Sequence, residues 1–263
     1  MERELDAAGL SCTFIDPRFE PGSRSQFEAA NSLGLRFSEA KASLANLDQR
    51  VNVNPNYGKK QAGGGISLTQ TALKAIMGYH HGEVMDGAIG CALSHAIALQ
   101  QAASKREGCN TLILESDAHL TEGFMEKATA AMESVNSTPR WDILMLGFKE
   151  LGAVVQPEHV GSACRAGYCW MTTGYVVTPA GAKKIVETML QAAIIPEIDD
   201  ILPAMAWGSP ILDIDEEFGP ANRIHDGQQV GADRQPLLVY RSRNPLVVEH
   251  QVHGKISNTC NGK

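Results

Sequence analysis

The sequence lacks the features that mark several specialised classes of protein. No run approaches the roughly 20 apolar residues of a membrane-spanning helix, so no integral membrane segment is predicted. The first residues are charged and contain no apolar core, in contrast to a secretory signal. The 263 residues carry a formal net charge of -7. A nucleic-acid backbone needs a basic face, so nucleic acid is not expected as a partner.

Cysteine is also scarce, with six residues in the chain, too few for a disulfide-built scaffold at this length. No Cys-x-x-Cys pair is present, so the sequence predicts no zinc site. Cys164 and Cys169 are close enough to pair in an oxidising compartment, but we favour isolated thiols in or near a core. The compartment stays open between the cytoplasm and, if a signal lies upstream of this sequence, the endoplasmic reticulum lumen.

What the sequence does contain is an alternation of apolar runs with helical patterns. These predict helices over 87–106, 121–135 and 179–193, and strands over 111–115, 141–146, 175–178 and 237–240. Thr121 is expected to cap the second helix, and Pro179 to occupy the first turn of the third. Apolar strands alternating with helices predict an α/β fold with a mainly parallel sheet and helices on both faces.

The whole chain, residues 1–263, is interpreted as a single domain with two parts. Residues 52–65 are rich in Asn, Gly, Lys and Pro, which predicts a surface loop. This loop separates an amino-terminal segment, 1–65, from a main body, 66–263. Ligands of open α/β sheets bind beyond the carboxyl ends of strands, so residues that follow strands are the first site candidates.

Two carboxylates directly follow the predicted strand that begins at residue 111. Glu115 and Asp117 flank Ser116, and this spacing allows both acids to leave the sheet and enter an adjoining cleft. One acid can hold a hard cation such as Mn²⁺ or Mg²⁺, and the other can accept hydrogen bonds from a ribose or a water. Spacing alone favours the alternative that these acids cap the next helix.

A series of segments adds weight to the first interpretation. Gly87–His95 (GAIGCALSH) precedes Leu112–Asp117 (LILESD), and further motifs follow at Trp141–Gly147, Thr173–Lys184, Pro196–Pro203, Pro236–Tyr240 and Ile256–Thr259. In this order they resemble glycosyltransferase family 25, over roughly residues 82–259. The family's strand usually ends in Glu-Asp-Asp, whereas Ser116 occupies the middle position here, and Asn258 replaces an Asp. The family's amino-terminal strand is not evident.

The resemblance implies a GT-A-like nucleotide-diphospho-sugar transferase fold. It implies transfer of a hexose, galactose or glucose, from a UDP-sugar to a hydroxyl of a glycan, a lipooligosaccharide or a protein. Asp117 and Glu115 would bind the metal, Mn²⁺ before Mg²⁺. The residues expected at the donor are Gly90, Ser94, His95, Glu115 and Ser116. A lone histidine on an apolar helix, such as His95, is otherwise more often a hydrogen-bonded core residue.

Asp199 and Asp200 are the candidates for the catalytic base. Inverting transfer, which the resemblance to the collagen-type branch implies, needs one carboxylate to take a proton from the acceptor hydroxyl. The alternative is that Asp199 caps a helix over 201–207. A second hypothesis for the whole chain is a catalytically degenerate nucleotide- or carbohydrate-binding protein, motivated by Ser116, Asn258 and the missing strand.

Overall fold

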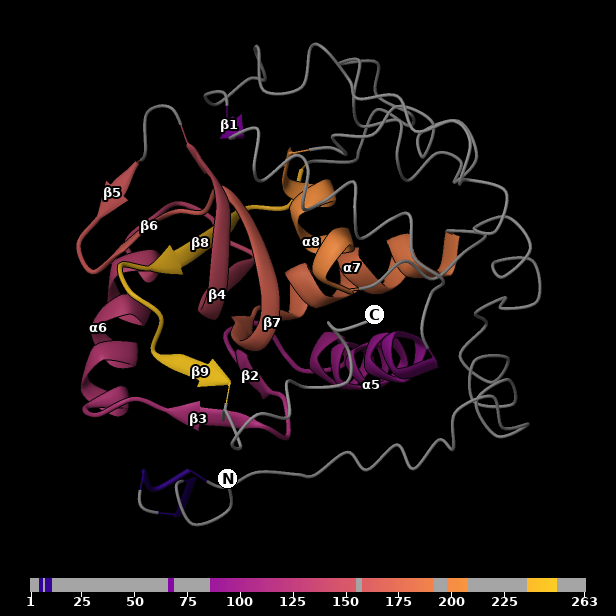
Figure 1. Cartoon of the computed structure of the whole chain (residues 1–263), viewed down its shortest axis with the longest axis horizontal. Coiled ribbons are helices and arrows are strands. Elements are labelled where there is room, and N and C mark those ends of the chain that lie inside the picture. The colour runs from indigo at the N-terminus through magenta and orange to yellow at the C-terminus, as the bar shows by residue number, and fades with distance from the viewer. Residues whose placement is uncertain are drawn as a thin grey trace, which may run out of the picture.

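The computed structural model describes residues 5–6, 8–10, 66–68, 86–154, 158–191, 198–207 and 236–249, and these form a mixed α/β body (Figure 1). The principal helices are α5 (Asp86–Ala103), α6 (Phe124–Asn136), α7 (Pro179–Gln191) and α8 (Ile198–Trp207). The strands are β1 (Ile66–Leu68), β2 (Thr111–Leu114), β3 (Ala118–Leu120), β4 (Ile143–Val154), β5 (His159–Val160), β6 (Ala163–Arg165), β7 (Tyr168–Val177), β8 (Val239–Ser242) and β9 (Val247–Glu249).

The main sheet has the strand order β2-β7-β4-β8-β6-β5, with β1 beside β4, and β3 pairs separately with β9. Among the described pairs only β4 and β8 run parallel, so the prediction of a mainly parallel sheet is wrong. Parallel neighbours need a long crossover, usually a helix. The chain instead passes from β4 to β7 through the short strands β5 and β6, without a described helix between them.

The two central strands are much longer than the sequence pattern predicts. β4 continues past residue 146 through Lys149 and Glu150, and β7 begins seven residues before Tyr175. Lys149 and Glu150 interrupt the apolar run of β4, and Thr172 to Gly174 interrupt that of β7, so neither strand reads as one continuous apolar segment. β2 and β4 both pair antiparallel with β7, so β2, β4 and β8 point in the same direction.

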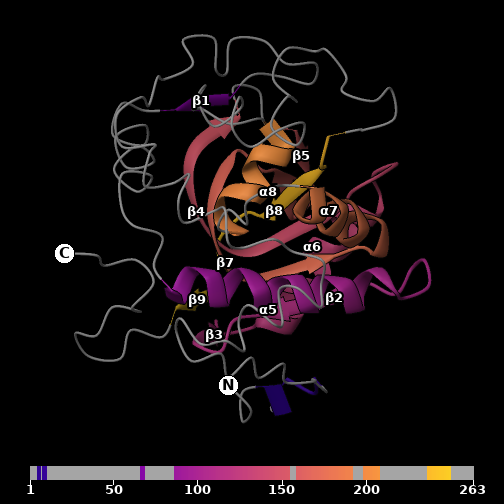
Figure 2. The same ribbon diagram turned by 90° about the vertical axis from the view of Figure 1, so that its right-hand side faces the viewer.

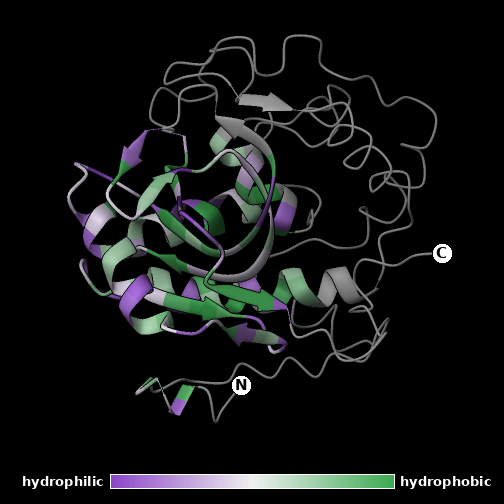
Figure 3. Cartoon of the chain, turned by 60° about the vertical axis from the view of Figure 1, so that its left-hand side comes forward, coloured by the Kyte–Doolittle hydropathy of each residue, from purple (hydrophilic) through white to green (hydrophobic). Residues whose placement is uncertain are grey.

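Helices cover both faces of the sheet, as predicted. Figure 1 shows α6 on one side and α5, α7 and α8 on the other, and Figure 2 views the latter side. Successive residues of β4 alternate between the two cores. Ile143 and Met145 join the core under α5, α7 and α8, whereas Leu144 and Leu146 join the core under α6. Figure 3 shows the resulting hydrophobic character of the central strands.

The predicted start of α7 is confirmed, whereas the predicted cap of α6 is wrong. Pro179 begins α7 as expected, and Gly181 N–H donates to the Thr178 hydroxyl 3.0 Å away, which caps the helix. Thr121 does not cap α6. That helix begins after Gly123, which has a φ of 69° and no side chain to cap it, and the Thr121 hydroxyl donates to Leu246 C=O at 3.0 Å.

A pair of glycines allows β9 to lie against the sheet. Gly147 of β4 faces Gly174 of β7. A Cβ on Gly174 would lie 2.9 Å from both Leu114 Cδ2 and Val247 Cγ2, closer than carbon atoms tolerate. The close approach of Val247 therefore depends on the missing side chain, and it brings β9 to the end of β2.

Cys164 and Cys169 are buried thiols rather than a disulfide, as the favoured interpretation predicted. Within the part of the chain that the structure describes, no helix combines the length and apolar character needed to cross a membrane.

Candidate acidic site at the end of strand β2

Glu115, Ser116 and Asp117 form the turn that leads from β2 into β3. Glu115 N–H donates to Thr173 C=O at 3.0 Å, which continues the pairing of β2 with β7 for one more residue. Glu115 C=O accepts a hydrogen bond from Ala118 N–H at 3.1 Å, which closes the turn. The next helix begins only at Phe124, after Gly123, so neither acid caps it.

Two side chains hold the carboxylate of Glu115. His95 Nε2 lies 3.3 Å from Glu115 Oε1, and the Thr172 hydroxyl donates to the same oxygen at 2.8 Å. Burial by itself would raise the pKa of Glu115. The hydrogen bond and the charge of His95, together with the hydrogen bond from Thr172, outweigh burial and leave the pKa of Glu115 below its ordinary value. The site therefore favours an ionised Glu115.

Thr172 also connects Glu115 to Asp199. Its hydroxyl oxygen lies 2.8 Å from Glu115 Oε1 and 2.8 Å from Asp199 Oδ1. A threonine hydroxyl has one proton, so it can donate to only one of these oxygens at a time. The second short contact is a hydrogen bond only when the acid that makes it is protonated and donates to the hydroxyl oxygen.

An irregular stretch of β7 directs Thr172 toward the two acids. The pairing steps from Gly147 and Gly174 to Lys149 and Trp170, two residues along β4 but four along β7. Within the extra residues, Met171 has a φ of 72°, a left-handed conformation that side chains disfavour. Bulges of this kind reorient side chains and often lie beside functional sites.

Two further carboxylates, those of Asp117 and Glu249, lie close enough to Glu115 for its negative charge to raise their pKa values. Burial, followed by repulsion from Glu115, raises the pKa of Asp117. Burial, followed by repulsion from Asp117 and Glu115, raises the pKa of Glu249. Glu249 reaches this position because β9 pairs with β3, in the register that places it opposite Ala118.

His95 supports Glu115 from the buried side of α5. It is only 4% exposed, and its Nδ1 lies 2.9 Å from the Tyr175 hydroxyl, with the two rings stacked 5.7 Å apart. Burial raises the pKa of Tyr175 well above its usual range, and the negative charges of Glu115 and Asp199 add to the effect. Tyr175 therefore stays a neutral phenol that fixes the histidine ring. A direct contact of His95 with the donor stays a prediction.

The structure brings His95, Glu115 and Asp199 together, with Asp117 beside them. The alternative role of Asp199 as a helix cap is wrong, because α8 already begins at Ile198. Ser116 is exposed in the turn. The remaining expected residues show less: Gly90 and Ser94 lie on α5, Asp200 lies on α8 with its side chain outside the described part, and Asn258 lies outside the described residues.

Sequence reasoning missed two residues of this site, Thr172 and Glu249. Thr172 follows the apolar run 168–171, where no charged or metal-binding pattern marks it, and only the irregular pairing of β7 reveals its orientation. Glu249 did carry a signal. Like Glu115, it is an acid at the end of a short apolar run, 246–248, a pattern that predicts a carboxylate at the end of a strand.

The oxygen ligands present suit a hard divalent cation. Glu115 and Asp117 offer carboxylates, which Mg²⁺ and Mn²⁺ prefer. Burial and, second to it, repulsion among the acids raise the pKa values of Asp117 and Glu249, and a bound cation would offset both effects. The chemistry of these carboxylates is compatible with a divalent cation, and the assignment of Mn²⁺ or Mg²⁺ to Asp117 and Glu115 stays a prediction.

Comparison with known proteins identifies the family. The model described as glycosyltransferase family 25 (LPS biosynthesis protein) matches residues 65–202, more than half of the chain. A glycosyltransferase 25 family member from Drosophila melanogaster is 29% identical over 164 residues, which make up 62% of this chain and 26% of that relative. Procollagen galactosyltransferase 2 from Homo sapiens is 29% identical over 159 residues, which make up 59% of this chain and 24% of the human protein.

The match therefore spans about a quarter of the length of these curated relatives. The matches place the chain among the glycosyltransferases. Within that class it belongs to glycosyltransferase family 25, as the ordered motifs predicted.

Proposed function

We propose that the chain transfers a hexose, galactose or glucose, from a UDP-sugar to a hydroxyl acceptor, with inversion at the sugar. The observation that carries this proposal is the contact of one Thr172 hydroxyl with both Glu115 and Asp199, which joins the expected donor site to the expected base. The names of the relatives support galactose and a protein acceptor, and the family description supports a lipooligosaccharide. We also propose that the domain has the GT-A-like fold of nucleotide-diphospho-sugar transferases.

In this proposal Asp117 and Glu115 hold the divalent cation, and Glu249 lies beside them. The cation, Mn²⁺ or Mg²⁺, supplies positive charge that neutralises the diphosphate as it leaves. Ser116, Ser94 and Gly90 contribute to the donor side. His95 and Thr172 keep the Glu115 carboxylate in one orientation, which spares the site from reorganising during the reaction.

Asp199 is the proposed base, with Asp200 next to it as the second candidate. Its carboxylate takes the proton of the acceptor hydroxyl while that oxygen attacks the anomeric carbon. The bond from the anomeric carbon to the diphosphate oxygen breaks, and its electron pair leaves with UDP. The Thr172 hydroxyl lies 2.8 Å from Asp199 Oδ1 and restricts the position of this carboxyl group, so Thr172 acts as a positioning residue.

A donor screen that reads free UDP, with and without Mn²⁺, tests the proposal. Asp117→Asn keeps the size of the side chain but removes its charge, so we expect metal-dependent turnover to fall by roughly 100- to 1,000-fold. Glu122→Gln is the matched control, because Glu122 is exposed after β3 and takes no part in the proposed site. Unchanged turnover in the Asp117 variant would contradict the assignment.

The degenerate binding protein stays the second candidate, and the exposed Ser116 in place of the family's middle Asp favours it. Calorimetry with UDP distinguishes the two. Binding without any turnover of UDP-sugars would support the binder. In that case Ser116→Asp, which restores Glu-Asp-Asp, is expected to produce measurable donor hydrolysis.

A further inference from the structure

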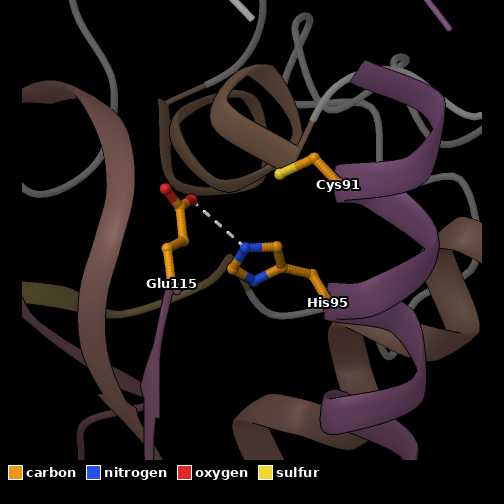
Figure 4. A group of neighbouring side chains, drawn as sticks. All are labelled: Cys91, His95 and Glu115. Atoms are coloured by element: carbon orange, nitrogen blue, oxygen red, sulfur yellow. Dashed lines mark hydrogen bonds and ion pairs between the residues drawn. The ribbon is translucent and has the colours of Figure 1, made fainter. Parts of the chain in front are cut away.

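A second group of possible metal ligands shares Glu115 with the acidic site. Cys91 and His95 are one helical turn apart on α5, and Glu115 approaches them from the end of β2 (Figure 4). The sulfur of Cys91, a ring nitrogen of His95 and a carboxylate oxygen of Glu115 all lie within 4.8 Å of one another. Figure 4 shows the three side chains directed into the same space between the helix and the strand end.

The distances suit a small tetrahedral ion. Zinc bonds to nitrogen and oxygen of about 2.1 Å place two tetrahedral ligands about 3.4 Å apart. His95 Nε2 and Glu115 Oε1 are already 3.3 Å apart. The Cys91 sulfur lies within 4.8 Å of both atoms. Zinc–sulfur bonds are longer, about 2.3 Å, so the sulfur can sit somewhat farther from the other two ligands than they sit from each other.

The surroundings also suit a metal-bound histidine. Histidine ligands usually bind a metal through one ring nitrogen and donate a hydrogen bond from the other, which fixes the ring. Here the second nitrogen, Nδ1, lies 2.9 Å from the Tyr175 hydroxyl, and Tyr175 is fully buried. Nδ1 therefore contacts Tyr175, and Nε2 is the nitrogen that faces Glu115 and would bind the metal.

The ligand set selects a different ion from that of the acidic site. Thiolate and imidazole favour zinc, whereas Mg²⁺ and Mn²⁺ prefer oxygen ligands. Three protein ligands leave the fourth tetrahedral position for a water molecule, as in catalytic zinc sites. The Glu115 side chain is 25% exposed, so an ion can reach it from solvent.

We propose that Cys91, His95 and Glu115 form a Zn²⁺ site, and that zinc bound there inhibits the enzyme by occupying Glu115. Binding would release the thiol proton of Cys91 and replace the contact of His95 with Glu115. The binding site stands on the geometry alone. The inhibition rests on the proposed function, because it requires Glu115 to serve the donor and its cation.

Co²⁺ titration of the full chain tests the binding, because a thiolate bound to Co²⁺ gives a charge-transfer absorption band. We expect the wild-type protein to show this band and Zn²⁺ to abolish it. Cys91→Ser should remove the band and weaken Zn²⁺ binding by at least tenfold. Cys109→Ser is the matched control, since Cys109 lies beyond the far end of α5, and it should keep the band.

A second measurement needs no variant. Zn²⁺ should protect Cys91 of the wild-type chain from alkylation, with each cysteine identified by peptide mass spectrometry, and should leave Cys109 unprotected. A band that persists in Cys91→Ser, or alkylation of Cys91 that zinc does not slow, would overturn the site.

Inhibition is tested separately by donor hydrolysis in Mn²⁺. Cys91 has no role in the proposed reaction, so Cys91→Ser should keep the wild-type rate and require at least tenfold more Zn²⁺ for inhibition. Equal inhibition of both proteins would overturn the regulatory part. Absence of turnover in both would contradict the proposed function, and the Co²⁺ spectrum and the alkylation result would then decide the zinc site alone.

Discussion

Lys184 Nζ lies 2.8 Å from each carboxylate oxygen of Asp142, and the Asp142 side chain is only 2% exposed. The same carboxylate accepts a hydrogen bond from Leu238 N–H at 2.9 Å. Asp142 thereby connects the start of β4 to α7 and to the segment before β8. Both partners belong to segments that resemble the family, so part of that resemblance reflects a structural ion pair at the end of the strands opposite Glu115.

Removal of the buried charge should destabilise the protein strongly. Asp142→Ala leaves Lys184 and Leu238 N–H without their acceptor, and we expect a loss of about 3 kcal/mol in the free energy of unfolding. Lys184→Met should also destabilise, because it leaves the buried carboxylate without its closest cation. Urea denaturation measures both. The control is Lys183→Met, since Lys183 is 69% exposed and its change should stay within about 0.5 kcal/mol.

Thr172 offers a test of positioning in the proposed reaction. Thr172→Val keeps the shape of the side chain but removes the hydroxyl that contacts Glu115 and Asp199. We expect kcat for transfer to fall about 10- to 100-fold, with a shifted pH profile because the two acids lose their shared partner. Thr172→Ser restores the hydroxyl and should restore most of the activity. If Val and Ser variants behave alike, the hydroxyl has no positioning role.

The strained backbone at Met171, directly before Thr172, can be tested by substitution. Met171 has a positive φ, which a β-branched residue tolerates poorly. Met171→Val should therefore destabilise the fold by about 1–2 kcal/mol and misdirect Thr172, lowering turnover. Met171→Gly accepts this backbone conformation and should preserve turnover better than Val. Thermal unfolding together with donor hydrolysis checks both variants, and a Val variant as active and stable as Gly would contradict this account of the bulge.

The buried thiols predict a pattern of chemical labelling. Burial, with smaller contributions from nearby charges, raises the pKa of Cys169 from 9.0 to about 12, and burial also raises the pKa of Cys164. The thiolate fraction of Cys169 at pH 8 is then roughly a thousandfold lower than that of an ordinary thiol. Iodoacetamide should leave both cysteines unmodified in the native protein and modify them after denaturation in urea. Rapid labelling of Cys169 in the native chain would show that this part of β7 opens readily.

Local patterns predicted the helices and the strand before Glu115 well, because each depends on residues that are neighbours in sequence. Pro179 and the apolar run at 111–114 are examples. The direction of the sheet was not predictable in the same way. It depends on β7 pairing between β2 and β4, which are far apart in sequence, and no local pattern specifies that arrangement.

The residues of the site were likewise predictable where they depend on one segment and unpredictable where they depend on contacts between segments. Glu115 and Asp117 were identifiable because they follow a strand directly, and their family resemblance reinforced the argument. The contact of Thr172 with both Glu115 and Asp199 joins three separate elements and depends on an irregular pairing. The group of Cys91, His95 and Glu115 likewise requires the helix and the strand to be placed side by side. No spacing rule within one segment contains this information.

The position of β8 has a consequence for how the molecule can be divided. This strand comes from residues 239–242, yet it lies between β4 and β6, so it joins the two halves of the main sheet. The segment matched by the family model ends at residue 202. A fragment cut at that boundary would lack the strand at the centre of its own sheet, as well as β9 and Glu249. During synthesis, too, the sheet becomes continuous only after the last described strands have left the ribosome.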